Sequence, residues 1–148
     1  MQFSTQLLYS ITAFTFLIST INAQVSGDII CSDGDPNDIE AADLDGIIEQ
    51  LQGGLPFGDI TDPVTLLAFG RAAVEGGDNN FIFGLDTAQV EIANPFIFES
   101  TTVTFATISA AVQQIKDRCC GVFPTCIGAT SQVQGDTGLS VNLIISRQ

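Results

Sequence analysis

Four cysteines are the residues in this sequence best suited to covalent chemistry: Cys31, Cys119, Cys120 and Cys126. Thiols can pair as disulfides, bind a metal or act as nucleophiles. The chain has no histidine, which removes the Cys–His and Ser–His–Asp pairs of nucleophilic catalysis. Zinc binding is also disfavoured, because two of the cysteines are adjacent and no histidine completes a ligand set. An even number of cysteines behind a secretory leader favours two disulfides.

The spacing of the cysteines favours one pairing of the three that four thiols allow. A bond between the adjacent Cys119 and Cys120 would strain the backbone. Cys119 shares the apolar face of a predicted helix, so we expect it to reach inward to Cys31. Cys120 would then close a short loop to Cys126, and the swapped pairing stays open. The longer bridge should stabilise the fold by about 3–5 kcal/mol in the chain-entropy model.

Carboxylates dominate the charge of the chain. The chain has seventeen acidic and four basic residues, which gives a formal net charge of −13. DNA, RNA and anionic membrane surfaces would be repelled, so we expect no nucleic-acid partner and no stable membrane insertion. Paired carboxylates could serve a glycosidase. However, acids this abundant make any pair non-specific, and the chain after the leader has no Trp or Tyr platform for sugars. We therefore predict no catalytic residues and no enzyme activity.

One acidic segment has part of the spacing of a calcium-binding loop. Asp33, Asp35 and Asn37 occupy positions 1, 3 and 5 of an EF-type pattern. The position that needs Gly holds Asp38, and the position that needs Glu holds Leu44. These three residues are a weak candidate metal site. The favoured interpretation is a capped helix start with acids facing solvent, and no cofactor is expected.

The first residues have the pattern of a secretory leader. Leu7–Ile21 is mainly apolar, and Asn22-Ala23 provides a small residue at the cleavage edge. A membrane anchor is the alternative, but the run is short for a span. We expect a signal peptide over residues 1–23 and a single secreted domain over residues 24–148.

Two helices are expected from apolar residues at steps of three and four. The first begins at Asp35-Pro36 and ends at Gly53-Gly54, and the second begins after a cap at Thr101 or Thr102. Their apolar faces carry Ala41, Leu44, Ile48 and Leu51 in the first, and Phe105, Ile108, Val112, Ile115 and Cys119 in the second. Residues 55–80 favour either a short helix from Asp62-Pro63 or an irregular segment.

Strands are expected where β-forming residues gather or alternate with polar ones. They are Asp28–Cys31, Phe81–Phe83, Gln89–Ile92, and two strands around a turn at Gln134–Gly138. The triplet Phe96–Phe98 could pair with Phe81–Phe83 as a further strand, and a place in the core is favoured over an exposed partner surface. The expected fold is α+β: a two-layer sandwich with two helices on one face of a mostly antiparallel sheet. A C-terminal β-hairpin closes it and disulfides staple it.

The order of these features resembles a group of small secreted fungal α/β proteins. Its residues are the helix opening at 38–42, the strand at 88–92, and the run Ala110–Ile115 followed by Cys119. The hairpin from Cys126 to Ile145, with its two glycines Gly128 and Gly138, completes it. The group includes the necrosis-inducing Hce-type effectors and the smut-virus killer toxins. The resemblance implies an α/β sandwich that acts outside the producing cell, without shared catalytic residues.

The sequence as a whole predicts a secreted fungal-type effector that acts by binding at a host surface or in the extracellular space. A killer-toxin-like or antimicrobial protein that acts on competing cells is the first alternative. A structural protein of the cell wall or matrix is the second. The expected partner is a host or competitor protein or a cell-surface component.

Overall fold

The computed structural model describes residues 25–32, 39–53, 63–68 and 78–148. These residues form an α+β fold with two helices, a mostly antiparallel sheet and two disulfides. The predicted leader and the weak metal candidate (Asp33, Asp35 and Asn37) lie outside them. No helix in this part of the chain is long and apolar enough to cross a membrane.

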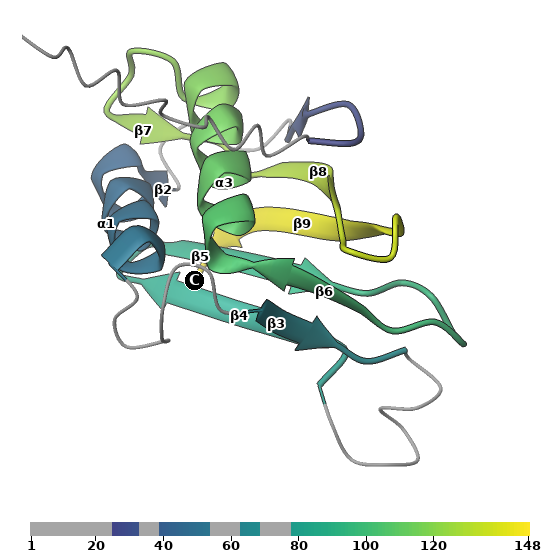
Figure 1. The fold of residues 1–148 in the computed structure, drawn as a ribbon. Helices are drawn as coiled ribbons and strands as arrows, with labels where there is room; N and C mark the ends of the chain where they lie inside the picture. The colour runs from purple at the N-terminus through teal and green to yellow at the C-terminus, as the bar shows by residue number, and fades with distance from the viewer. Residues whose placement is uncertain (1–24, 33–38, 54–62, 69–77) are drawn as a thin grey trace, which may run out of the picture.

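The two helices are α1 (Ala41–Gly53) and α3 (Phe105–Cys119), which lie side by side (Figure 1). Their apolar stripes face inward as the spacing predicts. The buried members are Leu44, Ile47, Ile48 and Leu51 in α1, and Phe105, Ile108, Val112 and Ile115 in α3. An ion pair between Lys116 and Asp45 joins the two helices at the surface.

The largest sheet has five strands, and every neighbouring pair in it is antiparallel. In spatial order the strands are β1 (Ile30–Cys31), β8 (Ala129–Gln134), β9 (Ser140–Arg147), β5 (Ala88–Ala93) and β4 (Asn80–Leu85). Alternate residues of the inner strands are buried, as a period of two requires. These side chains and the buried faces of the helices form one hydrophobic cluster.

Two small antiparallel sheets lie beside the large one. In the first, β2 (Ile39–Glu40) pairs with β7 (Thr125–Cys126). In the second, β3 (Pro63–Leu66) pairs with β6 (Thr101–Thr104). Because β2 runs directly into α1 and β6 runs directly into α3, each small sheet places the start of a helix.

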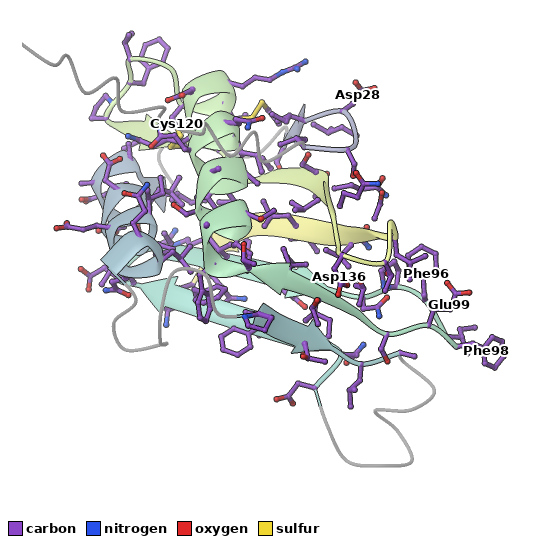
Figure 2. The ribbon with its side chains drawn as sticks, viewed as in Figure 1. Asp28, Phe96, Phe98, Glu99, Cys120 and Asp136 are labelled. Atoms are coloured by element: carbon purple, nitrogen blue, oxygen red, sulfur yellow. A yellow bond between two sulfur atoms is a disulfide. The ribbon has the colours of Figure 1, made fainter. Side chains whose placement is uncertain are left out.

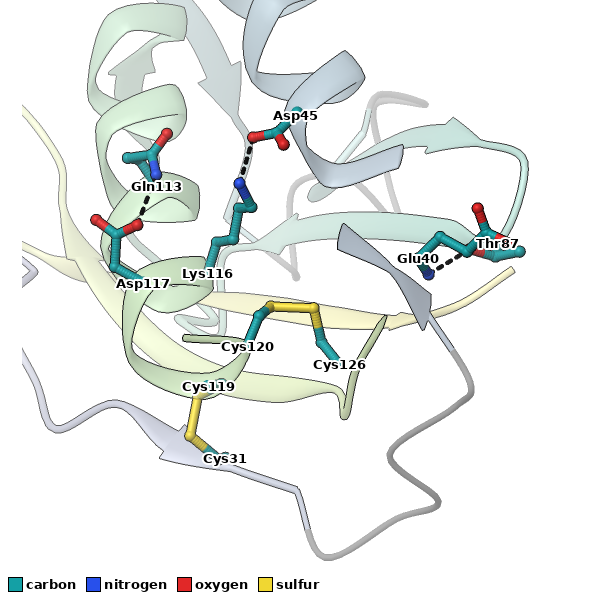
Figure 3. The surroundings of a disulfide bond; sticks show 10 residues. All are labelled: Cys31, Glu40, Asp45, Thr87, Gln113, Lys116, Asp117, Cys119, Cys120 and Cys126. Carbon is teal, nitrogen blue, oxygen red and sulfur yellow. Dashed lines mark hydrogen bonds and ion pairs between the residues drawn. A yellow bond between two sulfur atoms is a disulfide. The ribbon is translucent and has the colours of Figure 1, made fainter. Parts of the chain in front are cut away.

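The disulfides join Cys31 to Cys119 and Cys120 to Cys126 (Figure 3). This is the pairing that the sequence favours over the swapped one. The first bond ties β1 to the last residue of α3. The second closes a short loop after the helix, and both of its cysteines are buried. No described cysteine is free.

The structure corrects the predicted starts of both helices. The predicted start of the first helix at Asp35-Pro36 lies outside the described residues. Ile39–Glu40, inside the predicted helix, is a strand, so α1 begins at Ala41. The N-cap of α3 is Thr104, whose Oγ1 accepts a hydrogen bond from the backbone N–H of Thr107. The predicted caps Thr101 and Thr102 instead pair with Leu66 and Thr65 of β3.

Two further predictions are wrong over the described residues. Pro63–Leu66 is a strand and not the start of a helix, because its β-branched residues pair with the β-branched residues of β6. Phe96–Phe98 is not a strand, since the chain turns there between β5 and β6.

Candidate functional site

Over the described residues, the cysteines are paired and the acids form no metal-binding cluster. The four cysteines form two disulfides, so none is available as a nucleophile. Across the described ranges, no group of three or more potential metal ligands lies together. The features that call for an explanation are instead large apolar side chains that face solvent.

The most prominent of these features is the connection between β5 and β6, residues Asn94–Ser100, which we call the apolar loop. Its Phe98 is 87% exposed and its Ile97 is 55% exposed. Phe98 lies at one extremity of the molecule and points away from the body (Figure 2). Large apolar side chains held in solvent mark contact surfaces when they gather at one place.

The base of the apolar loop is anchored by Asn94, whose side chain is almost completely buried. Its Nδ2 donates to the backbone carbonyl oxygen of Glu99 at 2.8 Å, and its second N–H is shared between those of Leu66 at 3.2 Å and Leu67 at 3.3 Å. Its Oδ1 accepts a hydrogen bond from the backbone N–H of Phe96 at 3.0 Å. One amide therefore joins the two ends of the loop to each other and to the end of β3.

The far end of the apolar loop is held by a second set of hydrogen bonds. Ser100 Oγ accepts from the backbone N–H of Ala68 at 3.0 Å. Asp136, in the turn between β8 and β9, accepts from Thr101 Oγ1 at 3.1 Å and from the backbone N–H of Thr102 at 2.8 Å. These bonds, those from Thr102 first, lower the pKa of Asp136 below its ordinary value.

The described charged residues around the apolar loop are acidic. Glu99 and Asp136 are exposed at this end of the molecule (Figure 2). Asp78 is exposed near the base of the loop, where its backbone oxygen accepts a hydrogen bond from Leu67 N–H. The basic residues that the structure describes lie elsewhere: Lys116 pairs with Asp45, Arg118 is in the last turn of α3, and Arg147 lies beside Ala88, at the opposite end of β5 from the loop. The described part of this surface thus combines an apolar protrusion with a negative field.

A second exposed apolar pair lies at the other extremity of the molecule, in the loop that the Cys120–Cys126 bond closes (Figure 1). Val122 is 96% exposed and Phe123 is 69% exposed. The backbone of this loop is tied to the start of α1 by a hydrogen bond from Ala41 N–H to Pro124 O.

A shallow depression of about 420 Å³ lies on the large sheet. Its lining residues are Gly27, Asp28, Ile30, Thr130, Ser131, Gln132, Asn142 and Ile144. Asp28 is the only titratable residue among them.

Sequence reasoning favoured a core strand for Phe96–Phe98 over an exposed partner surface, whereas Ile97 and Phe98 are exposed in the structure. The turn chemistry of Asn94-Pro95 was the signal that could have found the apolar loop, because Asn-Pro favours the start of a turn. Comparison with models of known protein families and with curated proteins finds no match. The function must therefore be argued from the geometry of this chain.

Proposed function

We propose that this protein is a secreted fungal-type effector that acts by binding at a host surface or in the extracellular space, without catalysis. The observation that carries this proposal is the exposure of Phe98 on a loop whose base Asn94 anchors. The apolar loop is then the contact surface for a partner. Aromatic side chains, Phe among them, are enriched at the centres of protein interfaces.

The anchoring of the loop supports a binding role because ordering a loop on association costs free energy. Each immobilised side chain costs about 0.5–1.5 kcal/mol when a partner must order it. Asn94 fixes the backbone before binding, so the loop avoids part of this cost. The backbone that carries Phe98 is thus in place before a partner binds.

The disulfides and the architecture support the secreted part of the proposal. Disulfides persist in oxidising compartments and are rare in the cytosol. We also propose that α1 and α3 form one layer over the inner face of the five-stranded sheet, with β8 and β9 as the closing hairpin. A two-layer sandwich stapled at one end would leave the apolar loop at the opposite end free for contact.

A killer-toxin-like or antimicrobial role is the second candidate, and the loop closed by Cys120 and Cys126 favours it. Val122 and Phe123 are exposed there, and Arg118 immediately precedes the loop in the last turn of α3. Apolar and cationic groups together suit a negatively charged microbial surface. The net charge of −13 opposes this role, which is why it ranks second.

The test is infiltration of purified, oxidised residues 24–148 into leaf tissue at graded doses, with cell death and defence output scored. The wild type should give a response, and Phe98→Ser should need a dose at least about tenfold higher, the shift that losing about 1.4 kcal/mol of binding produces. Ile82→Thr is the matched control, because Ile82 is also an exposed apolar residue but lies on β4.

Equal responses to wild type and Phe98→Ser would remove the apolar loop from the proposed function. No response in several hosts, together with growth inhibition of competing microbes that Val122→Ser weakens, would favour the second candidate.

A further inference from the structure

We propose that the partner of the apolar loop is a protein with an apolar socket rimmed by Lys or Arg side chains. This inference rests on the proposed role of the loop as the contact surface. It adds the chemistry of the partner, which the proposed function leaves open.

The apolar part of the socket follows from the neighbouring side chains of Ile97 and Phe98. Burying one such side chain contributes about 1.5–3 kcal/mol. Two adjacent side chains on an anchored loop form a compact protrusion, which a concave pocket can surround on all sides. A flat surface would cover only part of the exposed Phe98 ring and would recover less of this free energy.

The basic rim follows from the charges around the protrusion. Glu99 is exposed directly after Phe98, and Asp136 receives hydrogen bonds from Thr101 and Thr102 at the base of the loop. Asp78 is exposed just before β4, near the base of the loop, and its backbone oxygen accepts a hydrogen bond from Leu67 N–H. Carboxylates near an apolar contact steer a cationic rim into place and reject a negatively charged one.

A lipid bilayer is a poorer occupant than a protein. Inserting Phe98 would bring the Glu99 carboxylate to the membrane surface, and an anionic leaflet would repel it together with Asp78 and Asp136. Two inserted side chains would have to overcome this repulsion alone. In a protein socket the same carboxylates would add to the affinity.

The probe is a phage library of random peptides, selected on the immobilised, oxidised chain and depleted against Phe98→Ser. We expect enriched peptides to combine aromatic or aliphatic residues with Lys or Arg. A synthetic peptide of the enriched sequence should bind Phe98→Ser at least about tenfold more weakly than wild type. Glu99→Gln should weaken binding by about two- to fivefold, as an exposed charge pair does, and added salt should weaken it further.

Asp28→Asn is the matched control, since it makes the same change of charge at an exposed site away from the apolar loop. Its affinity for the peptide should equal that of wild type. Enriched peptides without basic residues, or no peptide that depends on Phe98, would overturn the inference. Wild type that sediments with phosphatidylcholine–phosphatidylserine vesicles, in a manner lost in Phe98→Ser, would also overturn it and assign the loop to membranes.

These outcomes separate the inference from the proposed function. Basic, Phe98-dependent peptides support the socket even if leaf tissue gives no response. A leaf response lost in Phe98→Ser supports the proposed function even if the selected peptides lack basic residues.

Discussion

The side chain of Asn94 donates a hydrogen bond from Nδ2 to the backbone carbonyl oxygen of Glu99 at 2.8 Å and so closes the loop that carries Phe98. The same amide group holds two carbonyls at the end of β3. The exposed Phe98 is thus carried by a loop that a buried polar residue, a few positions before it, holds closed. The stability of the loop and the proposed function can be separated by substituting the two residues individually.

Asn94→Ala should lower the free energy of unfolding by about 1–3 kcal/mol, because it leaves buried backbone carbonyls without a donor. Urea denaturation followed by circular dichroism measures this change. Asn142→Ala is the control, since Asn142 is a partly exposed residue on β9. It should stay within about 0.5 kcal/mol of wild type. If both variants lose the same stability, the hydrogen bonds of Asn94 do not hold the loop.

Gly135→Ala should also be destabilising, by about 1–3 kcal/mol, because the new Cβ would overlap the side chain of Thr101. Gly53→Ala is the matched control, since no atom lies within 4 Å of a Cβ built there. At the end of α1 this alanine should be neutral or stabilise by up to about 1 kcal/mol. Thermal melting of the two variants checks the opposite signs. A Gly135→Ala protein as stable as wild type would show that the turn can move away from β6.

The sequence predicts those parts of the fold that depend on local periodicity. The inward face of α3 and the alternation in β5, β8 and β9 follow from spacings of three, four and two residues. The disulfide pairing was predictable for a related reason, because the face that Cys119 shares with Ile115 orients it toward the core. This orientation is only partly realised, since Cys119 is half-buried and Cys120 is the more buried of the two.

The site was not predictable, because it depends on contacts between distant parts of the chain. Asn94 reaches carbonyls at Leu66 and Leu67, in a region where the sequence equally favours a helix or an irregular segment. The pairing of β3 with β6 makes Thr101–Thr104 a strand, so α3 starts at Phe105 and residues 94–100 form the connection between β5 and β6. An apolar triplet such as Phe96–Phe98 has the composition of a core strand, and only this tertiary arrangement exposes it.

The two disulfides should differ in their contribution to stability. The Cys31–Cys119 bond spans 88 residues and the Cys120–Cys126 bond spans 6. In the chain-entropy model the longer loop contributes about 2 kcal/mol more. Cys119→Ser should therefore lower the thermal midpoint more than Cys120→Ser does, although Cys120 is the more buried residue. Scanning calorimetry of both variants measures the two midpoints, and equal values would contradict the prediction.

Asp136 should make the stability of the turn depend on pH. Hydrogen bonds from Thr102 lower the pKa of Asp136 in the folded state, so the ionised carboxylate stabilises the folded protein. This contribution is complete above the unfolded pKa of about 3.9 and is lost as the pH falls through the lower folded value. Asp136→Asn cannot ionise, so its loss of stability relative to wild type should be largest near neutral pH and should shrink in acid. Urea denaturation of both proteins, from neutral pH into acid, measures the difference between their free energies of unfolding. A difference that is independent of pH would show that the carboxylate charge does not hold the turn against β6.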